Sequence, residues 1–445
     1  MEKKWRWKTA MDAKNHEPPK RSFNYEFRIM DLPMVIILEI LSKLPIKSIF
    51  CCKIVCKLWY KLLTSDPLFL NMFHTRSPFS CLLLSDTDAP ITLIELKPDF
   101  DCYSCPVNKP IVLNPKFHLP PLNNLGVGFV KQTLRLIGTC NGYIGLLSKN
   151  HSIYISNPLL GEYFKVKLPE REKRVSKIIY GFCFSEVSGK YKVLRLINRK
   201  FQDHDPKVSE LEVYTLGVDE KWRNVGKAPY PLWGSLSKVN VNGALHWLDD
   251  EDAEKGARIC SFNITTEEVK PVPAPPGLKT PSVLLMLAEL SNCLCLSDYS
   301  DEHVDIWWMR EYGVAESWTK DRILMDSIPR DICDTKYIPT IIWKDGEILM
   351  RSHRGTQLVS YNPKEKKFRK VHVYGCGIDA TKYFPSFYSL NPSFYSLKTV
   401  MGDDFQVSSV YSKTEIKKGQ PGALSSRYAR DPEKSRTTRV CCTQP

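Results

Sequence analysis

The sequence predicts a multidomain α+β protein, in which a small N-terminal helical unit precedes an all-β, propeller-like repeat domain of about six modules. Apolar residues recur at helical spacing in residues 29–74, and short apolar runs bounded by turn residues recur from 78 to 400. Both ends of the chain are polar. We expect residues 1–28 to form a disordered leader and residues 401–445 a disordered tail, because both have few large apolar side chains.

The segment 29–74 carries two stripes of apolar side chains at helical spacing. Pro45 separates them, because a proline interrupts the hydrogen bonds of a helix interior. Leu68–Phe73 is expected to form a short closing turn. A unit of roughly 45 residues is too small to bury both stripes by itself, so we expect it to lean on a partner or on the rest of the chain. The stripes consist of Ile36, Ile37, Ile40, Leu41 and Leu44, followed by Ile49, Cys52, Cys56, Trp59 and Leu62 or Leu63.

Residues 78–400 repeat a module of strands and tight turns that is roughly 45–55 residues long, a length typical of propeller blades. Asn141-Gly142, Asn242-Gly243 and Asp345-Gly346 mark the clearest copies, because these dipeptides supply the positive φ angles of tight hairpins. Two looser copies lie between them, and Cys81–Pro120 is interpreted as a sixth, poorly marked copy. Recognition is expected in connections of variable length. These include Phe201–Lys207 and Asp249–Gly256.

Three joined motifs in the segment 29–74 resemble the F-box family. They are Leu32-Pro33, the run Glu39-Ile-Leu-Ser-Lys-Leu-Pro-Ile-Lys-Ser-Ile49, and Val55-Cys-Lys-Leu-Trp59. The family pattern combines Leu-Pro, an Ile-Leu step, Leu-Pro-x-Lys-Ser-Leu and Val-Cys-Lys-x-Trp. Val35, Cys51 and Cys52 depart from this pattern, where the family often has an acidic residue, Arg and Phe. These departures weaken expected contacts with the partner but leave the family resemblance intact.

The resemblance implies that the helices dock on a Skp-type adaptor, which connects them to a cullin scaffold and a RING subunit. Physically, this is recognition of helices by a groove. About half of the positions carried over from the family are expected to pack inside the motif rather than to touch the adaptor. The adaptor-facing or supporting positions are Leu32, Pro33, Ile37, Ile40, Leu41, Leu44, Pro45, Ile49 and Trp59.

The repeat region resembles the F-box-associated, kelch-like domain of a large plant F-box group, and the resemblance spans about residues 29–400. It implies a substrate-receptor subunit of an SCF-type (Skp–cullin–F-box) ubiquitin ligase, which recruits a target for ubiquitination and proteasomal degradation. The alternative is a non-ligase F-box protein that acts as an adaptor-bound inhibitor or scaffold. Neither the target nor its binding loops follow from the sequence. The motifs that carry the resemblance include Gly138–Gly142, Ile155–Pro158, Tyr180–Phe182, Tyr191–Leu196, Trp222-Arg223, Asn242–Trp247 and Trp318–Lys320.

The formal net charge of +14 comes from 63 Lys and Arg against 49 Asp and Glu, and half of it lies on the two polar ends. The rest forms no dense basic run, so no nucleic-acid partner is expected. No apolar run approaches the roughly 20 residues of a membrane-spanning helix, and the N-terminus lacks the apolar stretch of a signal peptide. We therefore expect no membrane partner and a location in the cytoplasm, the nucleus or both. The 15 cysteines are interpreted as reduced thiols.

The sequence contains no recognisable catalytic, cofactor or metal motif, so we expect a non-catalytic protein without a cofactor or metal. Cys102 and Cys105 lack a second pair of zinc ligands nearby, and the acidic residues from 298 to 305 do not have the spacing of a calcium loop. His246 is interpreted as a strand residue within a blade. Three tryptophans, Trp307, Trp308 and Trp318, fit a blade core better than a ligand cage.

One short sequence occurs twice near the end of the repeat region, as Pro385–Leu390 and again as Pro392–Leu397. It looks like a small tandem duplication in a segment that closes the domain. The sequence assigns it no function.

Overall fold

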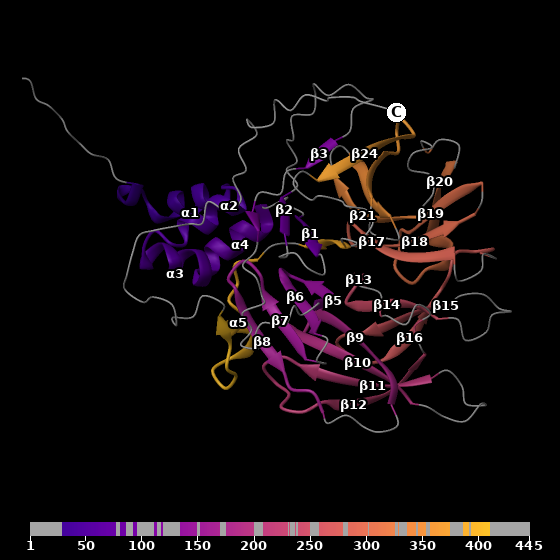
Figure 1. The fold of residues 1–445 in the computed structure, drawn as a ribbon, viewed down its shortest axis with the longest axis horizontal. Coiled ribbons are helices and arrows are strands. Elements are labelled where there is room, and N and C mark those ends of the chain that lie inside the picture. Colours follow the sequence, from indigo (N-terminus) through magenta and orange to yellow (C-terminus); the bar gives the residue numbers. More distant parts are fainter. Residues whose placement is uncertain are drawn as a thin grey trace, which may run out of the picture.

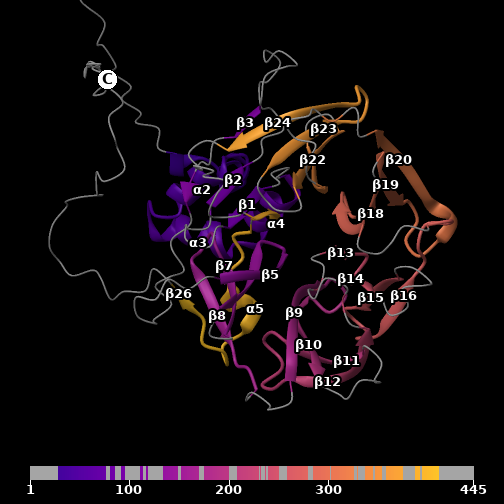
Figure 2. The same ribbon diagram turned by 45° about the vertical axis from the view of Figure 1, so that its right-hand side comes forward.

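A computed structural model shows a helical unit beside a ring of β-sheets (Figure 1). Seen after a rotation of 45°, the sheets lie around a common axis like the blades of a propeller (Figure 2). The predicted fold class is confirmed. The structure describes residues 29–76, 81–85, 92–95, 111–113, 117–118, 134–148, 152–169, 175–199, 208–229, 231, 236, 239–249, 258–278, 284–300, 302–324, 328, 336–343, 346–352, 357–373, 386–390 and 393–409.

The helical unit consists of α1 (Met34–Ser42), α2 (Ile46–Cys52), α3 (Lys57–Ser65) and α4 (Pro67–Arg76), after a 3₁₀ turn at Ile29–Asp31. Pro33 and Pro45 precede the first residues of α1 and α2. The short closing turn expected at Leu68–Phe73 is wrong, because α4 is a helix of ten residues. The Phe69 N–H donates to Asp66 Oδ1 over 3.0 Å, which satisfies one of the free donors at the start of this helix.

Five of the six sheets contain an antiparallel meander of four consecutive strands, with the first strand nearest the axis. The first two meanders are β5 (Leu134–Cys140), β6 (Tyr143–Ser148), β7 (Ile153–Asn157) and β8 (Glu162–Val166), then β9 (Val175–Ser185), β10 (Lys190–Arg199), β11 (Val208–Thr215) and β12 (Arg223–Pro229). The third is β13 (Val239–Val241), β14 (Ala244–Asp249), β15 (Arg258–Asn263) and β16 (Val269–Val272). The last two are β17 (Leu285–Leu290), β18 (Cys293–Tyr299), β19 (His303–Met309) and β20 (Trp318–Leu324), then β21 (Tyr337–Trp343), β22 (Glu347–Ser352), β23 (Leu358–Asn362) and β24 (Lys367–Val373).

The sixth sheet joins strands from both ends of the repeat region, in the order β25-β1-β2-β4. Its strands are β1 (Cys81–Ser85), β2 (Thr92–Glu95), β4 (Phe117–His118) and β25 (Ser386–Leu390). The expected sixth copy in Cys81–Pro120 is therefore a sheet, but β25 supplies its inner strand and lies beside both β21 and β5. This pairing closes the ring. The intervening β3 (Ile111–Leu113) pairs in parallel with β24 instead.

The predicted tail begins too early at residue 401. The helix α5 (Leu397–Met401) is followed by β26 (Ser408–Ser409), which pairs with β8. The Phe405 ring packs edge-on against Phe164, so a few apolar contacts and an open strand edge order this stretch. The leader 1–28, residues 410–445, Cys102, Cys105 and the proposed recognition segments 201–207 and 250–256 lie outside the described residues.

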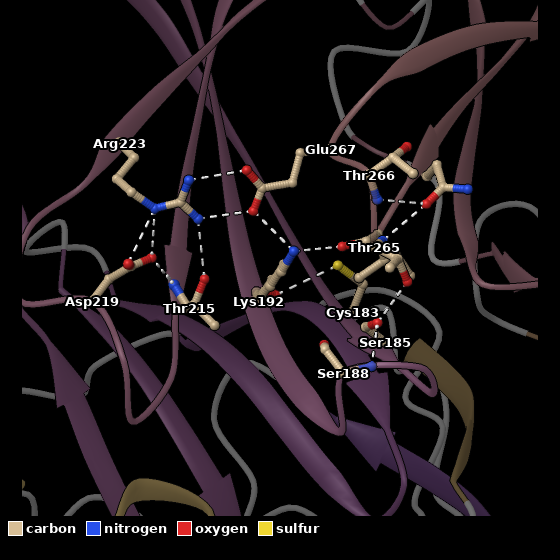
Figure 3. Close-up of polar contacts among 12 residues, drawn as sticks. Cys183, Ser185, Ser188, Lys192, Thr215, Asp219, Arg223, Thr265, Thr266 and Glu267 are labelled. Carbon is tan, nitrogen blue, oxygen red and sulfur yellow. Dashed lines mark hydrogen bonds and ion pairs between the residues drawn. The ribbon is translucent and has the colours of Figure 1, made fainter.

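A polar clasp joins the blade β9–β12 to the turn between β15 and β16 (Figure 3). The buried Lys192 ammonium donates to the Ile264 carbonyl over 2.5 Å and to Glu267 over 2.8 Å. Arg223 binds the same carboxylate and also Asp219. The Arg223 hydrogen bond, assisted by Lys192, lowers the pKa of Glu267 to about 2. A buried cation is costly unless it is paired, so this clasp specifies how the two blades fit together.

Candidate docking surface

The helical unit shares one apolar core with the blade β5–β8. Phe394, which is fully buried, places its ring 5.2 Å from Phe73 and 6.5 Å from Phe69 in α4. From the loop after α2, the Lys53 ammonium donates to the Leu159 carbonyl over 3.3 Å. Burial lowers the pKa of Lys53 to about 8. The expectation that the helices lean on the rest of the chain is therefore confirmed, and the two parts are packed as one body.

The second copy of the duplicated hexapeptide forms the link between the helices and the blade. Asn157 donates from Nδ2 to the carbonyls of Ser393 and Tyr395, at 3.0 and 2.7 Å. The Glu162 carboxylate accepts from the Leu397 N–H at 2.6 Å and so caps α5. The first copy forms β25, so identical side chains serve a strand in one place and an anchor in the other.

The structure places the nine sequence-predicted docking positions in three groups. Two are exposed, Pro33 and Ile40, whereas Leu32, Leu44 and Pro45 are partly buried. The other four lie in the shared core and present little surface to a partner. These four are Ile37, Leu41, Ile49 and Trp59. Four of the nine positions are thus buried in the shared core, and contact of the others with an adaptor stays a prediction.

Exposed apolar side chains gather on the helical unit. The described residues contain fifteen exposed large hydrophobic side chains, and ten of them belong to this unit. On α1, Ile36 and Ile40 lie one turn apart on the side opposite the buried residues. At the junction of α2 and α3, the exposed fractions of Ile54 and Val55 reach 76% and 66%. The ten are Ile29, Met34, Val35, Ile36, Ile40, Ile54, Val55, Leu58, Tyr60 and Leu68.

Such a concentration of exposed apolar groups marks an interaction surface, because isolated soluble domains rarely leave many together in water. We define the docking surface as Met34, Val35, Ile36, Ile40, Ile54, Val55 and Leu58. Beside it on α1, Glu39 and Lys43 form an exposed ion pair at 3.1 Å. An apolar surface with charge at its margin suits the groove of a protein partner.

Comparison with known proteins assigns both parts of the chain. The F-box domain model matches residues 29–71, and the model of the F-box associated beta propeller domain matches residues 122–397. The chain belongs to the F-box-associated propeller family. F-box protein At3g07870 of Arabidopsis thaliana is 28% identical over 382 residues, which cover 77% of this chain and 88% of the relative. F-box/kelch-repeat protein At3g23880 of the same plant is 24% identical, covering 81% and 96%.

The protein in the crystal structure of a nidogen/laminin complex matches with a TM-score of 0.37 and 11% identity, covering 71% of this chain and 99% of that one.

Sequence reasoning did not single out most of the exposed apolar residues of the F-box, for a physical reason. Met34 to Ile37 form an unbroken apolar run, so the helical period alone does not separate the inward side from the outward side. Packing in the shared core, where α1 lies against α4, decides that Ile37 is buried while Ile36 is exposed. Val55 could have indicated the exposed surface from the sequence alone. It belongs to the family motif, yet it is not part of either apolar stripe and so was not expected to be buried.

The remaining candidate residues that the structure describes take part in packing and hydrogen bonding within the blades. His246 is buried, with Nε2 2.7 Å from the Tyr312 hydroxyl, and Trp308 and Trp318 are buried in blade cores. Among the described residues, no group of three or more His, Cys, Asp or Glu is placed to hold a metal ion. No helix in this part of the chain is long and apolar enough to cross a membrane.

Proposed function

We propose that this F-box protein is the substrate-receptor subunit of an SCF-type ubiquitin ligase. In this role the docking surface binds a Skp-type adaptor, and the propeller holds a target protein for ubiquitination. The observation that carries the proposal is the gathering of ten of fifteen exposed large hydrophobic side chains on the F-box. Family membership supports it, because the matched domains are the two parts that such a receptor needs.

The fixed packing of the F-box against the propeller suits the role of a substrate receptor. Phe394, Lys53 and the Asn157 bridge hold the docking surface in one orientation relative to the blades. A target bound to the propeller would then stay at a constant distance from the adaptor. Holding two reactants together raises their effective concentration, which is how a subunit without covalent chemistry accelerates transfer of ubiquitin to a lysine.

The proposal is tested by capture of a purified Skp-type adaptor with the full-length protein. Exchange of Ile36→Gln together with Ile40→Gln removes apolar surface from the exposed side of α1 and keeps good helix formers in place. We expect adaptor binding to weaken at least tenfold, because exposed anchors in a groove carry much of the binding energy. Circular dichroism and the melting temperature should remain those of the wild type, since both side chains are exposed.

Val187→Gln is the matched control, because Val187 is the most exposed of the fifteen side chains and lies in a propeller turn. This variant should bind the adaptor like the wild type. Co-purification of cullin with the wild-type complex then distinguishes a ligase subunit from an adaptor-bound inhibitor or scaffold. Equal adaptor binding by the double variant and by the control would contradict the proposed docking surface.

A further inference from the structure

Two cysteines stand close together in the blade β17–β20. Cys293 is the first residue of β18, and Cys295 follows two positions later. Because side chains alternate along a strand, the two thiols belong to the same face of the sheet. The Cys295 thiol donates to the Cys293 carbonyl over 3.6 Å, so its sulfur leans towards Cys293. We call Cys293 and Cys295 the thiol pair.

The two members of the thiol pair differ in their access to solvent. Cys295 is fully buried in the apolar core that this blade shares with the blade β21–β24, whereas Cys293 is half-buried at the border of that core. The residues before Cys293 are Ser291 and Asn292, both exposed in the turn after β17. A small solute therefore reaches Cys293 first, and Cys295 reacts only through Cys293.

A cation lies on the same face as the thiol pair. The strand ladder places the buried member of the pair beside Trp308 on β19, and Trp308 beside Thr319 on β20. Arg310 spans this row, because its Nε donates to Thr319 Oγ1 over 2.9 Å and its Cζ lies 5.1 Å from the centre of the Trp308 ring. The Cys293 sulfur lies 3.1 Å from the carbonyl oxygen of Met309, the residue before Arg310. The guanidinium is thus held beside Cys293.

This arrangement makes the two thiols chemically different. The hydrogen bond from the Cys295 thiol, with help from the Arg310 guanidinium, lowers the pKa of Cys293 against the opposing effect of burial. The same hydrogen bond and burial raise the pKa of Cys295. By contrast, burial raises the pKa of Cys140 and of Cys183. The thiolate is the nucleophilic form of cysteine, so the thiol pair combines an accessible nucleophile with a neighbouring thiol.

We propose that the thiol pair is an oxidation site, at which a hydroperoxide such as hydrogen peroxide converts Cys293 and Cys295 into a reversible disulfide. The Cys293 thiolate attacks one peroxide oxygen, the O–O bond breaks, and a sulfenic acid and hydroxide form. The Cys295 sulfur then displaces the hydroxyl group of the sulfenic acid, its proton leaves with that hydroxyl as water, and the S–S bond forms. The two cysteines together lose two electrons, and the peroxide gains them.

The disulfide is expected to be easily reduced, because an extended strand holds the two cysteines almost too far apart. Two residues of extended strand advance about 6.7 Å, near the upper limit of about 6.8 Å for the Cα separation in a disulfide. Ring closure therefore requires the start of β18 to bend, next to a turn in which Ser291 and Asn292 both have positive φ. A strained disulfide is reduced more readily by free thiols, so we expect the modification to be reversible.

The test is peptide mapping of the folded full-length protein after treatment with hydrogen peroxide, alkylation with iodoacetamide in denaturant and digestion with trypsin. The tryptic peptide 280–310 contains both members of the thiol pair and no other cysteine. We expect it to escape alkylation and to be lighter than the dithiol form by the two lost hydrogens, and dithiothreitol should restore both thiols. The peptide 178–190, which carries the buried Cys183, should remain reduced in the same digest. In Cys295→Ser, dimedone should label Cys293, because the sulfenic acid then lacks a neighbouring thiol.

Arg310→Gln removes the cation beside Cys293 and should slow the oxidation about threefold, because less Cys293 is then thiolate at neutral pH. Lys320→Gln is the matched control, because the Lys320 ammonium lies 4.9 Å from the centre of the Trp307 ring. Trp307 is one residue before Trp308, so this second cation stands on the opposite face of the same blade. The control should react at the rate of the wild type.

Persistence of both thiols in the peptide 280–310 under peroxide, or oxidation of Cys183 at the same rate, would overturn the inference. Equal rates for Arg310→Gln and Lys320→Gln would contradict activation of Cys293 by the neighbouring cation. The readout is chemical and requires neither an adaptor nor a target, so its outcome is independent of the proposed function.

Discussion

Several buried polar side chains in the propeller are held by specific partners, and His246 is the clearest case. Its Nε2 lies 2.7 Å from the Tyr312 hydroxyl and its Nδ1 3.4 Å from the Val239 carbonyl. Burial lowers the pKa of His246 to about 4. The imidazole is therefore neutral in the folded protein at neutral pH, and a proton on it would have to be accommodated without solvent.

This environment predicts a loss of stability in mild acid. In the unfolded chain a histidine titrates near pH 6.5, so between about pH 6.5 and 4 the unfolded state binds a proton that the folded state excludes. The stabilisation is complete above about pH 6.5 and is lost as the pH falls towards 4. We expect His246 to account for about 2 kcal/mol of the decrease in unfolding free energy between about pH 7.5 and 5.

Urea denaturation at the two pH values measures this effect, with His246→Gln as the comparison. The variant lacks the titrating group, so its stability should depend less on pH across this window, whatever its absolute stability. An equal decrease for the variant and the wild type would assign the pH dependence to other groups.

Each blade depends on tight turns whose backbone φ angles are positive. Gly142 has φ +83°, and a Cβ atom placed there would lie 2.4 Å from Ser393 Cβ and 2.5 Å from the Ser393 nitrogen. Gly189 has φ +63° in the corresponding turn of the next blade, with nothing within 4 Å of such an atom. The two turns therefore share a backbone requirement, but only the first also needs space for the anchoring segment.

The pair separates strain within a turn from crowding by the anchor. Gly189→Ala should cost about 1 kcal/mol, because a residue with a Cβ is disfavoured at positive φ. Gly142→Ala should cost about 2 kcal/mol more, because Ser393 and its backbone must move. Equilibrium unfolding of both variants checks the difference, and equal costs would show that the Ser393 contact contributes nothing.

At the level of elements, the sequence predicted the helices and the repeated strands from their periods and turn dipeptides. It did not show that each blade starts one strand before its Asn-Gly turn, because the inner strand β5 or β13 has no marker of its own. The duplicated hexapeptide is the limiting case. Pro385–Leu390 supplies β25, whereas Pro392–Leu397 leads into α5, so neighbouring elements decide the structure of the same residues.

The same dependence on context applies to the docking surface. The family motif located the F-box, but the partition of α1 into buried Ile37 and exposed Ile36 required tertiary packing, in which α1 lies against α4 within the shared core.

For the whole molecule, the shared core means that the F-box and the propeller should unfold together. Phe394 occupies the centre of this core, so Phe394→Ala leaves a cavity between α4 and the blade β5–β8 and should cost about 3–5 kcal/mol. Loss of this contact uncouples the two parts. We expect the helical signal at 222 nm to melt at a lower temperature than the near-ultraviolet signal of the propeller, whereas both coincide in the wild type.

Tyr395→Ala is the matched control for this change, because the Tyr395 side chain is 37% exposed and the backbone carbonyl that binds Asn157 and Tyr143 remains. It should lower stability by about 1 kcal/mol or less and keep a single transition. If Phe394→Ala also unfolded in one transition at the wild-type temperature, the F-box would not depend on the propeller. The constant geometry between docking surface and target would then need another source, since the remaining ties at Lys53 and Asn157 are individual hydrogen bonds, each worth only about 1 kcal/mol net.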